Sequence, residues 1–171
     1  MLIASLPQRE RLTLREMTLA DLETVHRAEM TLFPADAWPL EMFLAEIQHE
    51  TRAYVVVEKE GEILGYAGAM SIADTADIQT IAVLPEHEGK GYGGIMLDFL
   101  HEEVTARGAE RILLEVRADN PRAQALYSRK GYRQIHRRRN YYNDGTDAII
   151  MEKSLNSPAP TTDAERLSHD S

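Results

Sequence analysis

Four glycines fall within seven residues of this chain, in a segment that reads Glu88-Gly89-Lys90-Gly91-Tyr92-Gly93-Gly94. An apolar stretch typical of a β-strand precedes this glycine turn, and a stretch with the periodicity of an amphipathic helix follows it. Closely spaced glycines let a backbone approach a ligand, and the first N–H groups of a helix have no intrahelical partner. The positive end of the helix dipole lies behind those groups. The turn therefore predicts a site for an anion, above all a phosphate or pyrophosphate.

The length and composition of the chain are those of one soluble globular domain. Its 171 residues suffice for a hydrophobic core, and the 43% hydrophobic and 27% charged shares are ordinary. No apolar run approaches the length of a membrane span, and the N-terminus lacks the pattern of a signal peptide. The absence of cysteine excludes disulfides, thiolate metal sites and a cysteinyl acyl-enzyme. The histidines also lack metal-ligand spacing, so we expect no metal. The lack of cysteine suits a reducing cytoplasm, and the lack of a long apolar run predicts no membrane contact.

The net charge of −9 argues against general nucleic-acid binding, which needs a basic surface. Residues 1–110 hold 20 acidic and 8 basic side chains, whereas residues 111–171 hold 8 acidic and 11 basic ones. The acidic part could attract a basic partner by long-range steering. It could equally be a solvated surface that aids solubility.

Hydrophobic periodicity predicts a mixed α/β sheet with helices on its faces. The patterns favour strands at 11–17, 51–59, 63–72, 77–83, 112–116, 132–142 and 148–155. They favour helices that follow Thr18, cover 39–50, run from the glycine turn to Gly108, and cover 121–130. The strand at 112–116 is short and apolar, which suggests a parallel neighbour of the strand at 77–83. We expect one domain at 11–155, a flexible segment at 1–10 and a disordered tail at 156–171.

Two known phosphate-binding patterns fit the glycine turn poorly. Gly89, Gly91 and Gly94 satisfy G-x-G-x-x-G, the dinucleotide fingerprint, and Glu115 lies about 20 residues on, as that pattern asks. In the dinucleotide fold, however, the strand runs directly into the glycines and the unit repeats as parallel βαβαβ. Here residues 84–87 intervene, and antiparallel strands are predicted on both sides. No G-x-x-x-x-G-K-[ST] loop is present. A nicotinamide enzyme therefore stays a weak alternative.

The arrangement instead resembles the GNAT acetyltransferases from about Leu12 to Leu155. That family has [QR]-x-x-G-x-[GA] after a strand that ends in a V-x-P-like segment, and residues 81–85 followed by 88–93 match it. The resemblance implies a GNAT fold of about seven strands and about four helices, with a parallel central pair that splays apart. It also implies acetyl-CoA as co-substrate, with its pyrophosphate on the amides of Gly89, Lys90, Gly91, Tyr92, Gly93 and Gly94 and its pantetheine arm along Ile81, Ala82 and Val83. Unpaired N–H groups beside a splayed strand suit such an amide-bearing arm.

One residue departs from the family pattern, because Glu88 stands where Gln or Arg is usual. A carboxylate repels a pyrophosphate unless it faces solvent or meets Lys90. Our hypothesis is that the backbone amides carry the binding and that the Glu88 side chain points away.

The second half of the chain resembles one subgroup of the family, the RimI-type enzymes that acetylate the N-terminal alanine of ribosomal proteins. The matching segments are 114–120, 125–127, 131–132, 138–142 and 147–151. The subgroup motifs are more specific than the glycine turn, which by itself supports only the superfamily.

Two residues of these motifs are candidates for proton transfer. Glu115 lies within an otherwise apolar strand, where desolvation is expected to raise its pKa, as suits a general base. The resemblance gives it that role, through water, whereas the structural alternative is an ion pair with Arg117 or another arginine. Tyr127 matches the family's general acid, which protonates the departing thiolate, although it could be a core tyrosine. Asn120 would cap the helix at 121–130 and, by resemblance, bind the CoA arm.

Aromatic residues are candidates for the acceptor groove. Trp38 lies with Phe33 and Pro34 in the loop between the first helices, and the equivalent loop lines the groove in relatives. Trp38 could instead be a hydrophobic staple of the helix at 39–50. Tyr141 and Tyr142 could touch a substrate peptide or pack in the structure. The basic run 136–139 is expected on a strand, as a solvated face or as a contact for the CoA 3′-phosphate or ribosomal RNA.

Together these features predict an acyltransferase that moves the acetyl group of acetyl-CoA to a protein N-terminal α-amine. The resemblance points to the N-terminal alanine of a small-subunit ribosomal protein, a basic partner that the acidic part of the chain would suit, without direct binding to nucleic acid. Direct transfer in a ternary complex is expected because no cysteine is available for a covalent relay. Acetylation of lysine or a small amine, and a non-catalytic CoA-binding regulator, stay as alternatives.

Overall fold

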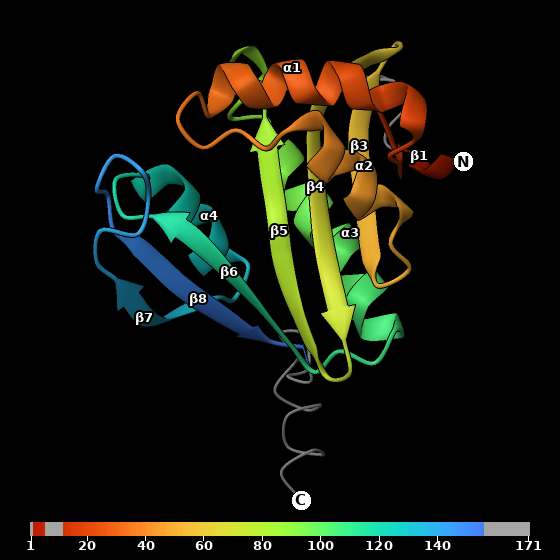
Figure 1. Ribbon diagram of the computed structural model, residues 1–171. Coiled ribbons are helices and arrows are strands. Elements are labelled where there is room, and N and C mark those ends of the chain that lie inside the picture. The colour runs from red at the N-terminus through yellow and green to blue at the C-terminus, as the bar shows by residue number, and fades with distance from the viewer. Residues whose placement is uncertain (1, 6–11, 156–171) are drawn as a thin grey trace, which may run out of the picture.

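Eight strands pair in the order β1-β2-β3-β4-β5-β6-β8-β7 in the computed structural model, which describes residues 2–5 and 12–155 (Figure 1). The strands are β1 (Leu2–Ser5), β2 (Leu12–Glu16), β3 (Arg52–Lys59), β4 (Glu62–Ile72), β5 (Thr75–Val83), β6 (Arg111–Arg117), β7 (Arg133–Arg138) and β8 (Ala148–Ser154). Every neighbouring pair is antiparallel except β5 with β6. The mixed sheet predicted from the sequence is therefore confirmed.

Strand β1 was not expected, because we had assigned residues 1–10 to a flexible segment. Residues 2–5 instead pair antiparallel with β2 and give the described part of the sheet one strand more than the seven predicted. Pairing of this kind satisfies backbone N–H and C=O groups that β2 would otherwise expose along its outer edge. The rest of that segment and the predicted tail at 156–171 lie outside the described residues.

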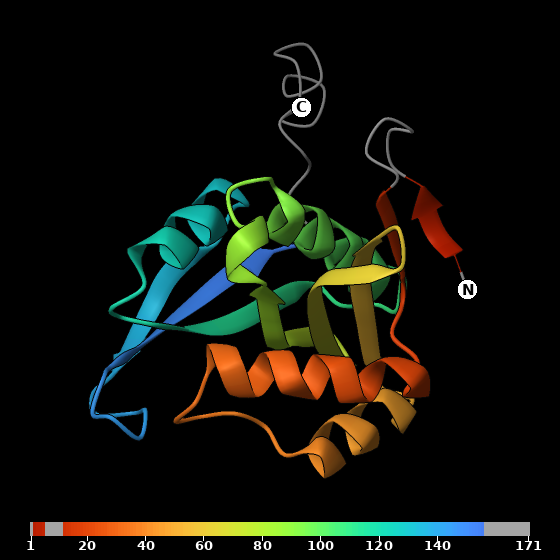
Figure 2. The same cartoon turned by 90° about the horizontal axis from the view of Figure 1, so that it is seen from above.

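Four α-helices of the described residues cover the sheet on both faces (Figure 2). They are α1 (Leu22–Leu32), α2 (Leu40–Gln48), α3 (Tyr92–Ala106) and α4 (Pro121–Arg129), and the single turns of 3₁₀-helix η1 (Leu19–Asp21) and η2 (Pro85–His87) precede α1 and α3. One apolar core lies between the sheet and α3 with α4. A second lies between the sheet and α1 with α2. Helices α1 and α2 lie over β3 to β5 and leave one face of β6 and β8 uncovered (Figure 1).

The strand predicted at 132–142 is wrong at its C-terminal end, because β7 ends at Arg138. Asn140 has a φ of 51°, in the left-handed region, which interrupts an extended strand. Backbone bonds from Tyr142 N to Thr146 O (3.1 Å) and from Gly145 N to Tyr142 O (2.9 Å) then fold the following residues into a loop. Tyr141 and Tyr142 therefore lie in the β7–β8 loop and not on a strand.

The two parallel strands stay paired over only three residues each. Thr75, Ala76 and Asp77 pair with Arg111, Ile112 and Leu113, and beyond this point, which we call the fork, β5 and β6 separate (Figure 1). A register shift opposite Gly68 and Ala69 leaves Gln79 as an extra residue of β5 just past the fork. Such a bulge bends a strand and increases its twist. The splayed parallel pair implied by the family resemblance is thus confirmed.

Candidate active site

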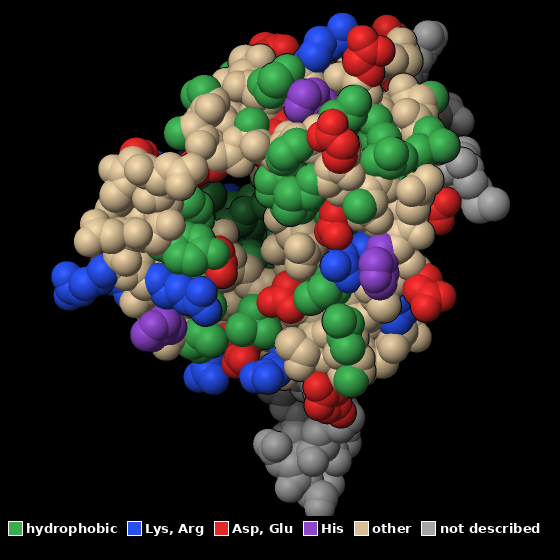
Figure 3. Space-filling view, in the orientation of Figure 1, with side chains coloured by type: hydrophobic (Ala, Val, Ile, Leu, Met, Phe, Trp, Pro, Cys, Tyr) green, Lys and Arg blue, Asp and Glu red, His purple; other side chains and the backbone are tan. Residues whose placement is uncertain are grey.

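A cleft of about 630 Å³ is lined by the end of β5, the glycine turn with the start of α3, α4 and the end of α1. Figure 3 shows that the surface is hollowed. Nine of the ten residues predicted to bind the cofactor line the cleft, namely Ile81, Ala82, Val83, Gly89, Gly91, Tyr92, Gly93, Gly94 and Asn120. The tenth, Lys90, is exposed and is not part of the lining. Phe33, predicted with Trp38 for the acceptor groove, lines the cleft too, and sequence reasoning missed Leu32, His87, Arg122 and Arg129, which also line it.

The glycine turn has the backbone geometry that its sequence requires. Gly89 and Gly91 have φ values of 80° and 87°, a region that side-chain-bearing residues rarely adopt. Gly91 is the N-cap of α3, so the free N–H groups of the first turn of α3 belong to the residues that follow it. Most of these groups border the cleft, which suits an anion at this end.

Close contact between α3 and α4 brings a second helix N-terminus to the same end of the cleft. A Cβ atom on Gly93 would lie 3.2 Å from Leu126 Cδ2, and one on Gly94 would lie 3.1 Å from Lys130 Cε. Asn120 caps α4 as predicted, because its Oδ1 accepts a 3.1 Å hydrogen bond from Ala123 N. A larger residue at either glycine would therefore require the Leu126 or Lys130 side chain to give way by a few tenths of an ångström.

Glu88 pairs with Arg122 and not with Lys90. Its Oε2 lies 2.9 Å from Nη1 of Arg122, a residue in the first turn of α4. The proposal that the backbone amides carry phosphate binding stays a prediction, but the cation beside Glu88 comes from another helix. Sequence spacing gave no signal for this pair, because 34 residues separate the two side chains.

Glu115 lies just beyond the fork on the uncovered face of β6. Its predicted burial is wrong, because the side chain is exposed while its strand neighbours Leu114 and Val116 are buried. No helix covers this side chain, because α1 and α2 lie over β3 to β5. The alternative of an ion pair with an arginine is wrong for the described residues, because none of their ion pairs involves Glu115 and the Arg117 guanidinium pairs with Asp36, Asp119 and Asp144.

Asp77 and Tyr141 lie near Glu115, and the Glu115 carboxylate contributes to a raised pKa in both. Burial, followed by the charge of Glu115, raises the pKa of Asp77, the last paired residue of β5. Interaction with the Glu115 carboxylate raises the pKa of Tyr141 in the β7–β8 loop. Residues from three parts of the chain thus converge on the uncovered side of the fork, and sequence reasoning had missed Asp77.

Tyr127 lines the cleft from α4, and its side chain is buried in the core beneath. Burial is the main cause that raises the pKa of its hydroxyl above the ordinary 10.0, and nearby Tyr142 contributes. Burial and then Glu115 raise the pKa of Tyr142 to about 12. Tyr142 therefore lies within electrostatic reach of both predicted proton-transfer residues. Tyr127 is thus a buried core residue that also lines the cleft, and its role as the general acid stays a prediction.

Trp38 occupies the position of a hydrophobic staple, as the structural alternative predicted. It immediately precedes Pro39, the N-cap of α2, and its ring centroid lies 5.1 Å from that of Phe43 in the second turn of the helix. Trp38 does not line the cleft. Leu32 and Phe33, at the end of α1, border it instead, so the apolar contact comes from the beginning of the loop that Trp38 ends.

Side chains join the α1–α2 loop to the β7–β8 loop near Arg117, at the end of β6 that lies away from the fork. Arg117 Nη1 lies 3.2 Å from Asp36 Oδ2 in the first loop, and its Nη2 pairs with Asp144 in the second. Asn143 Nδ2 donates a 3.0 Å hydrogen bond to Ala35 O. The Arg117 guanidinium also stacks 4.8 Å from the ring centre of Tyr142. These contacts form a bridge between the loops.

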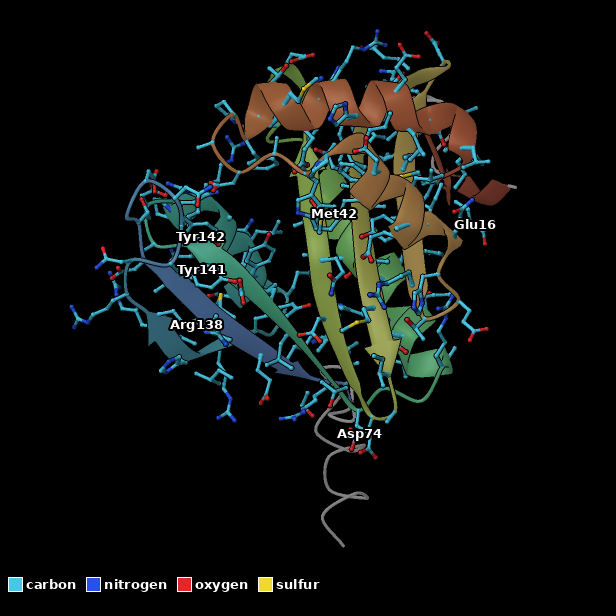
Figure 4. All side chains as sticks on the ribbon, viewed as in Figure 1. Glu16, Met42, Asp74, Arg138, Tyr141 and Tyr142 are labelled. Carbon is cyan, nitrogen blue, oxygen red and sulfur yellow. The ribbon has the colours of Figure 1, made fainter. Side chains whose placement is uncertain are left out.

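Figure 4 shows Tyr141 and Tyr142 together beside β6, with Arg138 below them. Their rings form an edge-to-face pair with centroids 5.1 Å apart, and Arg138 lies 5.6 Å from the ring centre of Tyr141. Both tyrosines lie outside the lining of the cleft. They border the uncovered face next to Glu115, which suits a groove for an acceptor chain.

Within residues 2–5 and 12–155, no helix combines the length and apolarity needed to cross a bilayer. The same residues contain no group of three or more histidine or acidic side chains that could hold a metal ion.

The family model of the acetyltransferase (GNAT) family matches residues 19–132. The chain belongs to the GNAT family. This GNAT protein is 36% identical over 144 residues to the putative [ribosomal protein bS18]-alanine N-acetyltransferase of Bacillus subtilis, across 83% of this chain and 95% of that one. It is 34% identical over 143 residues to the [ribosomal protein bS18]-alanine N-acetyltransferase of Escherichia coli, across 81% and 95% of the two chains.

Solved structures agree with this assignment. The crystal structure of the Escherichia coli ribosomal-protein-S18-alanine N-acetyltransferase superposes with a TM-score of 0.77 at 30% identity, over 88% of this chain and 98% of that one. A putative acetyltransferase from Salmonella typhimurium, solved with acetyl-CoA, shares the fold with a TM-score of 0.75 at 19% identity, over 89% and 98% of the chains.

This GNAT protein is therefore an N-acetyltransferase of the RimI type. The family match removes the nicotinamide alternative, as the intervening residues of the glycine turn had indicated.

Proposed function

We propose that this enzyme acetylates the N-terminal α-amine of a protein, with the N-terminal alanine of a small-subunit ribosomal protein as its acceptor. The names of the Bacillus subtilis and Escherichia coli relatives support the acceptor. The observation that carries the proposal is the placement of two proton-transfer groups beside one fork, with Glu115 on its uncovered face and Tyr127 in the cleft. The acidic balance of residues 1–110 suits a basic acceptor protein.

Acetyl-CoA supplies the acetyl group as a thioester, an acyl donor that an uncharged amine attacks. In our proposal its pyrophosphate binds the amides of the glycine turn and its arm binds backbone groups of Ile81 to Val83. Asn120 holds the same arm from the start of α4. The separation of β5 from β6 leaves the backbone of β5 beyond the fork without a partner on β6, so an extended ligand can take that place.

Glu115 acts as the general base in this proposal. An N-terminal amine has a pKa of about 7.7–8.0, so near neutrality much of it is ammonium and cannot attack. The Glu115 carboxylate accepts one ammonium proton through a water molecule and later releases it to solvent. The free amine lone pair forms the new C–N bond, and the nitrogen loses its second proton to solvent as the amide forms. Exposure keeps the carboxylate in contact with that water, so the role does not depend on the burial that the sequence had predicted.

Tyr127 acts as the general acid. As the C–S bond breaks, the electron pair goes to the CoA sulfur, and the Tyr127 hydroxyl donates its proton there. Burial keeps the hydroxyl protonated, because it raises the pKa well above the ordinary 10.0. The tyrosine regains its proton from solvent, so that each turnover consumes one thioester and one amine and releases one thiol and one amide.

Two peptides of the same composition test the acceptor. One begins with a free alanine and contains an internal lysine, and the other has its α-amine blocked by a formyl group. We expect acetyl-CoA consumption with the first peptide only, with the acetyl group placed on alanine by fragment mass spectrometry. Acetylation of the lysine in both peptides would contradict the proposal and favour the lysine alternative, and release of no CoA with either peptide would favour a regulator.

The ribosomal acceptor is tested in cells. Mass spectrometry of small-subunit ribosomal proteins, from cells with and without the gene, is expected to show the loss of one N-terminal acetyl group. An unchanged acetylation pattern would contradict the ribosomal acceptor while leaving the peptide result intact.

A further inference from the structure

An exposed ion pair lies across the phosphate end of the cleft. Glu88 Oε2 and Arg122 Nη1 are 2.9 Å apart, and their side chains are 43% and 65% exposed. Both residues line the cleft, so the pair belongs to its wall. Exposed pairs of this kind contribute little to stability, because water screens them and two long side chains lose freedom. A stronger partner for either member can therefore displace the other at low cost.

The arginine of this pair also covers the glycine turn. A Cβ atom built on Gly89 would lie 3.0 Å from Arg122 Nη2, so the second nitrogen of the guanidinium rests against the backbone of the turn. One nitrogen of the guanidinium thus pairs with a carboxylate, and the other lies beside Gly89 in the turn whose amides suit a phosphate. Guanidinium groups bind phosphate oxygens in this two-pronged geometry.

The local charges favour an exchange of partners. The N-termini of α3 and α4 both point toward this end, and Arg129 lines the same cleft. Glu88 is the one acidic side chain in the cleft lining. A bound pyrophosphate would lie close to the negative carboxylate of Glu88, and the two would repel each other. If Glu88 stayed paired with Arg122, this repulsion would remain.

We propose that Arg122 binds the pyrophosphate of acetyl-CoA and that Glu88 holds the guanidinium over the glycine turn until the pyrophosphate replaces it. On binding, Arg122 exchanges its carboxylate partner for a phosphate oxygen, and Glu88 turns to solvent. The cation of the phosphate site thus comes from α4 and not from the glycine turn. This inference rests on acetyl-CoA binding in the cleft, as set out under the proposed function.

A double-mutant cycle measured by titration calorimetry with acetyl-CoA tests the exchange. We expect Arg122→Gln to weaken binding about tenfold or more, since a charge-assisted contact is lost. We expect Glu88→Gln to tighten binding by a factor that does not exceed about tenfold, because repulsion and competition for Arg122 both disappear. In the Glu88→Gln background, Arg122→Gln should still weaken binding at least as much.

The cycle separates a phosphate ligand from a residue that only neutralises Glu88. In the second case, Arg122→Gln would weaken binding in the wild-type background and have no effect once Glu88 is glutamine. That result would overturn the proposal. Circular dichroism of each variant shows whether it is folded, and both substituted side chains are exposed, so loss of the fold is not expected.

Shortened ligands identify the group that Arg122 contacts. The effect of Arg122→Gln should persist with 3′-dephospho-acetyl-CoA, which keeps the pyrophosphate, and vanish with acetylpantetheine, which has no phosphate. An effect that disappears with the dephospho compound, or persists with acetylpantetheine, would overturn the assignment to the pyrophosphate.

Arg133→Gln is the matched control. Arg133 is an arginine on β7 whose side chain is 79% exposed, and it is not part of the cleft lining. Its loss should leave acetyl-CoA affinity unchanged, and an equal loss of affinity would mean that bulk charge explains the Arg122 result, against the proposal. Wild-type protein that binds acetyl-CoA but does not acetylate peptides would contradict the proposed function alone. Wild-type protein that fails to bind acetyl-CoA would overturn both.

Discussion

The Tyr66 hydroxyl donates a 2.7 Å hydrogen bond to Oε1 of Glu29, a carboxylate buried between α1 and the sheet. The backbone N–H of Trp38 donates a 3.2 Å bond to the other oxygen. Glu29 therefore ties α1 to strand β4 and to the loop before α2, close to where Leu32 and Phe33 reach the cleft. Burial is the strongest influence on Glu29 and raises its pKa above the ordinary 4.5, although both hydrogen bonds favour the ionised form.

We expect Tyr66→Phe to lower the free energy of unfolding by about 1–3 kcal/mol at pH 7, because a buried carboxylate loses a hydrogen bond. A raised folded pKa means that Glu29 contributes most stability in acid and that this contribution declines as the pH rises through the folded pKa. The loss in Tyr66→Phe should therefore shrink as the pH falls toward 4.5. Urea unfolding at both pH values measures it. Tyr141→Phe, at an exposed ring, is the control, and equal losses in both variants would contradict the prediction.

Glu115→Gln should lower turnover about a hundredfold or more at pH 7 while acetyl-CoA affinity stays nearly unchanged, because the base is lost and the glycine turn is intact. Turnover should recover at high pH, where the α-amine, with a pKa of about 7.7–8.0, loses its proton unaided. Steady-state rates from pH 6 to pH 10 and calorimetry measure the two effects. Unchanged turnover at pH 7 would remove Glu115 from the mechanism.

Tyr127→Phe should lower turnover by roughly tenfold to a hundredfold, because the thiolate then leaves without a proton donor. The raised pKa of Tyr127 means that the wild-type enzyme keeps this proton beyond pH 10.0, so its profile should show no alkaline fall from this group below that pH. The matched variant is Tyr132→Phe, at a ring that is also buried in the same core but hydrogen-bonds His101. Equal rates in the two variants would indicate a packing role for Tyr127.

Arg117→Lys should raise KM for the acceptor peptide about tenfold and leave acetyl-CoA affinity unchanged. A lysine cannot pair with Asp36 and Asp144 at the same time in the two-pronged geometry of arginine, so the bridge between the loops would loosen. Peptide kinetics and calorimetry separate the two quantities. Arg111→Lys, on the same strand and paired with Glu152, is the control, and a fall in kcat alone would contradict a positioning role for Arg117.

Local signals predicted most elements because they depend on neighbouring residues. The capping pair at Thr18 and Asp21 forms a 2.8 Å bond from Thr18 N to Asp21 Oδ2, and Asn120 caps α4. The predicted C-terminal end of β7 was wrong because Asn140 adopts a left-handed conformation. Asparagine tolerates this conformation but does not require it, so the sequence did not indicate it. Strand β1 was missed because pairing with β2, and not its own composition, defines it.

The glycine turn could be located from the sequence, since positive φ values and a helix N-terminus follow from glycine spacing and apolar periodicity. The charged side chains around the glycine turn could not be predicted from the sequence. Arg122 reaches Glu88 from another helix, and Glu115 is exposed because no helix covers its face of β6. Backbone preferences act over a few residues, whereas contacts between distant segments depend on packing of the whole sheet. The sequence by itself therefore determined which groups this protein can offer to a thioester and an amine, and only the tertiary structure decided which of them meet, because partners far apart in the chain are brought together by burial of the common core.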